Sequence, residues 1–146
     1  NKKNVFLLIA GFSEGQYSLE ISKQIKNNKN ILNLGWVSTS KLREVLISAD
    51  IMLQPGSLSN TFIEGVCSGL FLILDDTPQG KYLTKWGNGK VIKKPTAKKI
   101  AKVLDISFEL LTTKSFEENE KIIFAAKQLD YRNNAKISLE NIISKK

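Results

Sequence analysis

The sequence predicts an α/β fold in which a parallel sheet carries helices on both faces. Short apolar runs such as Val5–Ala10 and Leu70–Leu74 are typical of strands that are buried on both sides. Other segments, such as Thr96–Leu111, carry apolar residues at helical spacing. Because strand and helix patterns alternate along the chain, parallel strands joined by helices are expected. A chain of 146 residues is long enough to form one domain with its own core.

Five strands are expected, each followed by turn residues. The strands are Val5–Ala10, Ile31–Leu34, Asp50–Gln54, Leu70–Leu74 and Lys90–Ile92. Glycine follows the first two strands, at Gly11 and Gly35, and two aspartates, Asp75 and Asp76, follow the fourth. Glycine and aspartate are common turn residues, so each of these strands is expected to stop there.

Helices are expected between and after the strands. They run from the Gly11–Gly15 turn to about Lys26, from Ser38–Ser40 to Ala49, from the Pro55–Asn60 turn to Gly69, and over Lys81–Trp86, Thr96–Leu111, Ser115–Leu129 and Arg132–Ser144. Hydroxyl residues mark several of the starts. Ser38–Ser40 can cap its helix, and Ser13-x-x-Gln16 and Ser115-x-x-Glu118 have the spacing of capping boxes.

The polar turns that follow the strands are expected to lie at one rim of the sheet. The carboxyl ends of parallel strands meet at the same edge, and open α/β sheets bind ligands there. The turns at this rim are Gly11–Gly15, Gly35–Ser38, Pro55–Thr61 and Asp75–Gly80. Four such turns together favour a ligand site more strongly than any single motif does.

The amino-acid composition favours one class of ligand and excludes several kinds of site. Lysine and arginine number 22 against 14 aspartates and glutamates, so the net charge of +8 favours anionic partners. The chain has no histidine and a single cysteine, Cys67. A zinc site, a Ser-His-Asp triad and an internal disulfide are therefore excluded within this chain. Cys67 lies on an apolar helix face and is expected to be a small core residue rather than a nucleophile.

The segment Pro55–Glu64 carries the most informative pattern. It follows an apolar strand and opens a helix, so backbone N–H groups at the helix start are expected to be unpaired and able to bind a phosphate. Glu64, one turn into the helix, can reach the hydroxyls of a sugar. An alternative stays open, because Thr61-x-x-Glu64 is also a capping box in which Glu64 bonds back to the Thr61 N–H.

Five segments, taken in order, resemble one known family. They are Phe6–Gly11, Asn30–Val37, Leu46–Pro55, Asn60–Gly69 and Trp86–Gly89. The chain is similar to the C-terminal, nucleotide-sugar-binding domain of GT-B fold glycosyltransferases of the group-1, surface-polysaccharide type. The resemblance implies a Rossmann-like domain that is one half of a GT-B fold. It also implies an enzyme activity, the transfer of a sugar from a nucleoside diphosphate to a glycan or lipid-linked acceptor in polysaccharide biosynthesis.

The resemblance implies roles for residues of the helix that starts near Asn60. Glu64 matches the family glutamate that accepts hydrogen bonds from the ribose hydroxyls. Ser59, Asn60 and Thr61 match the turn whose N–H groups face the diphosphate. Gly56 stands where many relatives have another glutamate, which touches the donor sugar. The catalytic residues are unknown, since the base of an inverting member would come from the other domain.

Three residues of the first two turns also match the family's nucleotide pocket. Trp36 and Val37 match the edge where the base lies, and Gly11 matches the loop that borders the pocket. Each has a simpler alternative. Trp36 can be a partly buried aromatic at a strand end, and Gly11 can serve turn geometry alone.

The resemblance also implies the setting in which the chain works. Residues 1–146 are expected to be a single nucleotide-sugar-binding domain, part of a larger protein with an N-terminal acceptor domain. The location is expected to be cytoplasmic, at or near the inner face of the membrane. No metal or cofactor is expected beyond the donor, for which a UDP-sugar is the expectation. Two alternatives stay open: a catalytically inactive nucleotide-binding module or subunit, and a related nucleotide-sugar enzyme such as a 2-epimerase.

Two charged clusters allow more than one interpretation. Asp75 and Asp76 could bind Mg²⁺, although adjacent acids at a strand end are more often turn residues. The densest basic stretch consists of Lys90, Lys93, Lys94, Lys98, Lys99 and Lys102. It is expected to be a solvated helix face, with attraction to an acidic membrane surface as the alternative. Nucleic acid is not an expected partner, because no recognition motif accompanies the lysines.

Overall fold

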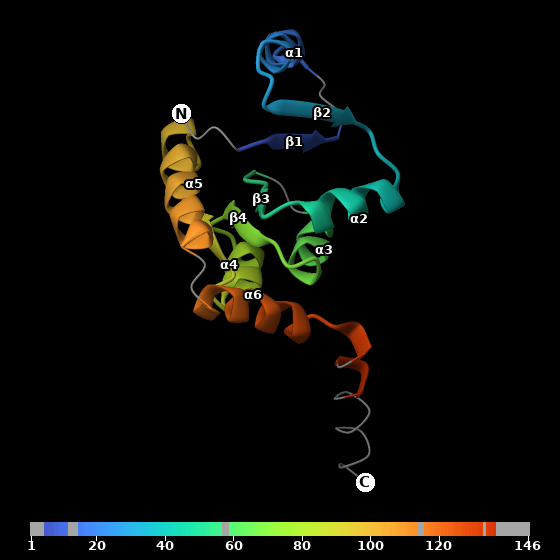
Figure 1. The fold of residues 1–146 in the computed structure, drawn as a ribbon, viewed down its shortest axis with the longest axis vertical. Helices are drawn as coiled ribbons and strands as arrows, with labels where there is room; N and C mark the ends of the chain where they lie inside the picture. The colour runs from blue at the N-terminus through green and yellow to red at the C-terminus, as the bar shows by residue number, and fades with distance from the viewer. Residues whose placement is uncertain (1–4, 12–14, 57–58, 114–115, 133, 137–146) are drawn as a thin grey trace. The chain divides into compact units, whose positions relative to one another are not determined.

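A computed structural model describes residues 5–11, 15–56, 59–113, 116–132 and 134–136. They form an α/β fold in which parallel sheets are flanked by helices, and Figure 1 shows the elements. The predicted fold class is thereby confirmed. The chain divides into two compact units, one of residues up to Val45 and one of residues from Leu46 onward. That residues 1–146 act as a single nucleotide-sugar-binding domain stays a prediction.

The first unit contains a two-stranded parallel sheet. β1 (Leu7–Ala10) pairs with β2 (Ile31–Gly35), and α1 (Ser18–Lys26) joins the two strands and contacts β2. The register shifts after Ile9, so that Ala10 lies opposite Gly35. The carboxyl ends of the two strands therefore lie together, as the parallel arrangement requires.

The first strand differs from the prediction that it is buried on both faces. Leu7 is 44% exposed, and none of the four residues of β1 is buried. Within its sheet, β1 has one neighbour, β2. The α1 helix, which contacts β2, has no buried residue. An apolar run therefore predicts the strand here but not its burial, because burial depends on how many elements cover the sheet.

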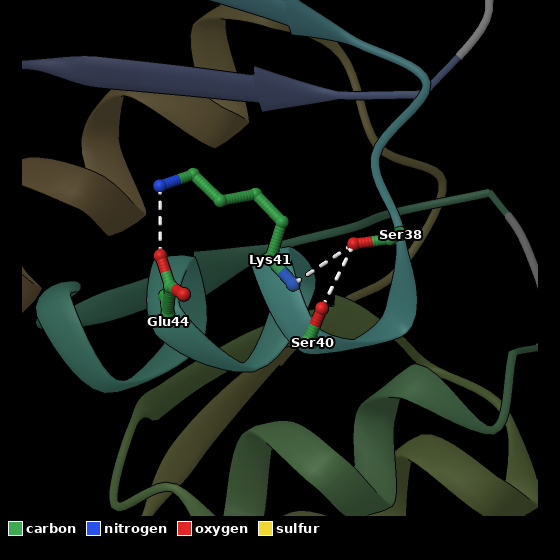
Figure 2. A network of polar contacts seen from close by, with 4 residues as sticks. All are labelled: Ser38, Ser40, Lys41 and Glu44. Carbon is green, nitrogen blue, oxygen red and sulfur yellow. Dashed lines mark hydrogen bonds and ion pairs between the residues drawn. The ribbon is translucent and has the colours of Figure 1, made fainter.

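The serine-rich start of α2 (Thr39–Ser48) forms the expected cap. The Ser38 Oγ accepts a hydrogen bond from the Lys41 N–H at 3.3 Å and lies 3.0 Å from the Ser40 Oγ (Figure 2). Lys41 Nζ also donates to the Glu44 carboxylate at 2.8 Å. A hydroxyl cap of this kind contributes about 1 kcal/mol to the stability of a helix, whereas an exposed ion pair such as Lys41–Glu44 contributes little.

The second unit is built on a three-stranded parallel sheet in the order β3–β4–β5. Its elements are β3 (Ile51–Leu53), α3 (Thr61–Cys67), β4 (Phe71–Asp75), α4 (Pro78–Thr84), β5 (Gly89–Ile92), α5 (Ala97–Thr112) and α6 (Phe116–Gln128). The strands are joined by α3 and α4, while α5 and α6 follow the sheet. This is the repeated strand–helix order that the sequence predicts.

The core of the second unit is centred on β4. Phe71 and Ile73 form a buried cluster with Ile122, and apolar residues of α5 pack against it. On the other face of the strand, Leu72 lies beside Met52 and Gly65 of α3. Because alternate residues of β4 contact different helices, the sheet has α5 on one face and α3 on the other (Figure 1).

One helix begins earlier than predicted, and some predicted features lie outside the described residues. α4 starts at Pro78 rather than Lys81, because the Thr77 Oγ1 accepts a hydrogen bond from the Gly80 N–H at 3.0 Å and proline occupies the first helical position. The capping serines Ser13 and Ser115 lie outside the described part, as does most of the helix expected over Arg132–Ser144.

Candidate functional site

The turn after β3 is held by a carboxylate from the end of β4. The Gly56 N–H donates a hydrogen bond to the Asp75 Oδ2 at 2.7 Å, and the Gln54 N–H donates to the Ile73 carbonyl. Gly56 has a φ of +95°, a left-handed conformation that glycine adopts without strain. Parallel pairing of β3 with β4 places the two strand ends together, so Asp75 can anchor the turn.

The start of α3 satisfies more of its own donors than the sequence predicts. The Thr61 N–H donates to the Ser59 Oγ at 3.2 Å, and this hydroxyl also donates to the Thr61 Oγ1 at 2.8 Å. The N–H groups of the next residues donate to the carbonyls of Ser59 and Asn60. Among the described residues, the N–H groups of Ser59 and Asn60 make no hydrogen bond. The Thr61 N–H, by contrast, is already bonded to Ser59.

Glu64 lies one turn beyond Asn60 and is half-buried. Within the described parts of the chain, its carboxylate makes no hydrogen bond and no ion pair. Its backbone is fixed in α3, since its N–H donates to the Asn60 carbonyl and its carbonyl accepts from Ser68. The side chain is therefore positioned by the helix and has its acceptor oxygens available.

The capping-box alternative for Glu64 is wrong. A capping box needs the threonine as the N-cap residue, outside the helix, with its N–H bonded to the glutamate. In the structure the helix already begins at Thr61, Asn60 is the N-cap residue, and the Thr61 N–H is bonded to Ser59. The earlier start of the helix therefore pairs the Thr61 N–H with Ser59 instead of Glu64.

Glycine beside Glu64 lets α3 pack closely on the sheet. A Cβ atom on Gly65 would lie 2.6 Å from the Met52 Sδ and 3.3 Å from the Leu72 Cδ2. Gly65 is buried, so the backbone that carries Glu64 rests directly on β3 and β4. The sequence pattern gave Gly65 no role, although a glycine inside a helix is itself a signal of close packing.

Asp75 and Asp76 make contacts in two different turns, Asp75 with the turn after β3 and Asp76 with the start of α4. Asp75 holds Gly56, and Asp76 Oδ1 forms an ion pair with Lys81 Nζ at 2.7 Å. The Asp75 Oδ1 is buried and makes no hydrogen bond with any described residue. In the part of the chain that the structure describes, no three histidine, cysteine or acidic side chains form a group that could hold a metal ion. The geometry favours the turn interpretation for both aspartates.

In the first unit, the predicted residues gather where β1 and β2 end. The Gly11 N–H donates to the Gly35 carbonyl at 2.8 Å, and Gly11 has a φ of +135°. Trp36 and Val37 follow directly. Trp36 is 80% exposed, so the alternative of a partly buried aromatic is wrong, and Val37 is half-buried. An exposed indole next to a glycine turn provides a flat surface on which a ring could stack.

Cys67 is exposed, which corrects the prediction that it is a core residue. It is the last residue of α3 and lines an open groove between that helix and α6, together with Ile123 and Asp130. Partial burial raises the pKa of its thiol, and the nearby charges of Asp130 and Glu64 raise that pKa further. The raised pKa favours the protonated thiol, the less nucleophilic form of the side chain.

Comparison with known proteins gives a structural match without a sequence match. No family model matches the chain, and no curated protein matches it. Among solved structures, the chain is similar to WaaG, described as a glycosyltransferase involved in lipopolysaccharide biosynthesis, with a TM-score of 0.66 and 17% identity. The match covers 88% of this chain and 34% of WaaG, so the chain spans about a third of the length of that protein.

The likeness to WaaG defines the class of fold. It is a Rossmann-like α/β fold that matches one half of a GT-B structure. None of the described helices combines the length and the apolar character needed to cross a membrane.

Proposed function

We propose that this chain is the donor-binding domain of a glycosyltransferase and binds a nucleoside-diphosphate sugar. The observation that carries the proposal is the position of Glu64, an acid without an ionic partner among the described residues. It lies one turn after the Ser59 and Asn60 N–H groups, on the helix that follows β3 in a GT-B-like fold. Backbone donors suit a diphosphate, and a free carboxylate suits the two hydroxyls of a ribose.

The proposed reaction is transfer of the sugar to a glycan or lipid-linked acceptor. The departing nucleoside diphosphate gains negative charge as the glycosidic bond breaks. Backbone donors at Ser59 and Asn60 would stabilise this charge, and the ribose contact at Glu64 would fix the donor's position. The acceptor and any catalytic base are assigned to a second domain, which is the partner that the proposal requires.

Calorimetric titration of the chain with UDP, GDP, ADP, UMP and a UDP-sugar tests donor binding. One diphosphate, with UDP as the expectation, should bind saturably, and Glu64→Ala should weaken it by about 1–3 kcal/mol, the range for hydrogen bonds to a charged group. Glu117→Ala is the matched control, since Glu117 forms an exposed pair with Lys121 on α6. Equal affinity for the parent chain and Glu64→Ala would refute the assigned role.

A further inference from the structure

One continuous part of the chain carries a charge equal to the whole net charge of the protein. Between Asp76 and Asp105 there is no acidic residue, whereas eight lysines lie between Lys81 and Lys102. The remaining 14 lysines and arginines equal the 14 acids in number, so the rest of the chain is neutral overall. All eight of these lysines are exposed.

The fold carries these lysines on elements that meet along one strand. Their residues belong to α4, β5, α5 and the turns between them. β5 is one of the two outer strands in the order β3–β4–β5, and both α4 and α5 contact it, from opposite faces of the sheet. We call this surface the lysine edge and define it as the exposed side chains of residues 81–102. Lys81 is partly neutralised by Asp76, at 2.7 Å, and the other seven have no acidic partner among the described residues.

The turn after β5 holds its lysines in place. Lys99 Nζ donates to the carbonyls of Lys93 and Lys94 at 2.8 and 3.1 Å. Lys94 itself has a φ of +50°, unusual for a residue other than glycine. Ile100 and Val103 of α5 pack against the core, so the lysines of that helix face away from it. The backbone that carries these lysines is therefore fixed by the packing of α5, and the Lys99 ammonium group is held by the turn.

Aromatic residues accompany the charge on α4. Tyr82 is 51% exposed, and its ring packs edge-on to that of Trp86 at 5.8 Å between centroids. Lys85 Nζ lies 4.2 Å from the Tyr82 centroid and 4.7 Å from the Trp86 centroid. Tyrosine, tryptophan and lysine together are typical of membrane–water interfaces. Lys85 occupies one face of each ring and Trp86 is half-buried, so the pair is a less open stacking platform for nucleic-acid bases than two bare rings would be.

We propose that the lysine edge binds the surface of an anionic lipid bilayer. Its lysines neutralise acidic headgroups, and Tyr82 and Trp86 enter the interfacial layer. A bilayer presents a broad sheet of negative charge, which matches eight lysines distributed over α4, β5 and α5. The proposal concerns where the protein resides and does not depend on donor binding.

Vesicle binding tests the proposal on the full chain. Partition should be strong on phosphatidylcholine mixed with phosphatidylglycerol, weak on phosphatidylcholine alone, and reduced by added salt. The triple variant Lys93→Gln, Lys98→Gln, Lys102→Gln should lower the partition roughly a hundredfold, at roughly fivefold for each lysine. Its matched control is Lys23→Gln, Lys26→Gln, Lys29→Gln, which makes the same change in net charge at exposed positions of the first unit. The control should change the partition only a few-fold.

Three outcomes would overturn the proposal. The first is equal loss in the two triple variants, because binding would then follow net charge alone. The second is equal partition onto neutral and anionic vesicles. The third is displacement from anionic vesicles by RNA or DNA at the same phosphate concentration, which would make nucleic acid the preferred partner. As a supporting readout, Trp86 emission in a Trp36→Phe background should shift to the blue on anionic vesicles, and no shift would remove α4 from the docking surface.

Discussion

Gly89→Ala should destabilise the second unit far more than Gly65→Ala does. A Cβ atom on Gly89 would lie 2.5 Å from the backbone oxygen of Leu72, its partner on β4, and 2.7 Å from the Thr84 Cγ2. Ordinary contact begins at 3.4 Å, so the new atom is about 0.9 Å too close to a backbone group of a central strand. The strands must separate, and their pairing then weakens.

The loss of stability in each variant depends on which atom the new methyl group meets, the Leu72 carbonyl oxygen at Gly89 or the Met52 sulfur at Gly65. Overpacking against an immobile group costs about 1–3 kcal/mol, and a loss of about 2 kcal/mol lowers the Tm of a chain of this length by roughly 4–8 °C. At Gly65 the close atom is the Met52 sulfur, which belongs to a flexible side chain and can move aside. Alanine also gains up to about 1 kcal/mol over glycine inside a helix, so Gly65→Ala should change stability by less than about 1 kcal/mol.

Urea unfolding of both variants, followed by circular dichroism, measures the difference. Gly89→Ala should lower the midpoint at an unchanged slope, and Gly65→Ala should leave the midpoint close to that of the parent chain. Equal midpoints for the two variants would refute the reasoning. They would mean that a methyl group at position 89 fits beside the Leu72 carbonyl oxygen without separating β4 from β5.

Three further substitutions test other parts of the second unit. Asp75→Ala removes the acceptor of the Gly56 N–H and should weaken diphosphate binding several-fold in calorimetry, while Asp75→Asn, which keeps an acceptor, should weaken it less. Thr77→Ala removes the cap of α4 and should cost about 1 kcal/mol of unfolding free energy in urea. The control is Thr39→Ala, since Thr39 is exposed and its hydroxyl makes no hydrogen bond with any described residue. Asn88 is fully buried, and its side-chain amide donates a hydrogen bond to the Leu83 carbonyl. Asn88→Asp removes this donor and buries a charge, so the free energy of unfolding should fall by more than about 2 kcal/mol at neutral pH. Burial raises the pKa of the introduced carboxyl, so this loss should shrink as the pH falls from neutral toward the ordinary pKa of an aspartate, and should change no further below it.

The sequence predicts the strand and helix order because that order is written in local patterns. The run Leu70–Leu74 is the clearest case, since its apolar residues become the buried strand at the centre of the core. The same reasoning misjudges β1, where an equally apolar run is not buried. Burial is a property of the neighbours that tertiary structure supplies, and a single run carries no information about them.

Hydrogen-bond partners at the candidate site were harder to predict than the positions of its residues. Thr61 and Glu64 have the spacing of a capping box, yet Ser59 takes the bond because the helix starts one residue earlier than that motif requires. Spacing fixes which residues can meet, whereas the choice between competing acceptors depends on differences of a fraction of an ångström. The position of Cys67 was also not predicted: it follows apolar residues on α3, but it ends the helix and lies in the wall of a groove.

Gly56 and Asp75, which lie 19 residues apart in the sequence, form one structural feature. Gly56 stands where the family that the sequence resembles often has a sugar-binding glutamate. Its backbone is left-handed, a conformation that costs residues other than glycine about 1–2 kcal/mol. Asp75 fixes that conformation by accepting the Gly56 N–H. A glutamate at this position would therefore have to strain the turn or break its anchor. The absence of the glutamate thus goes with a different loop geometry, in which the carboxylate at the turn comes from Asp75 on the neighbouring strand. The second oxygen of that carboxylate, Asp75 Oδ1, lies beside the same turn, is buried and makes no hydrogen bond with any described residue.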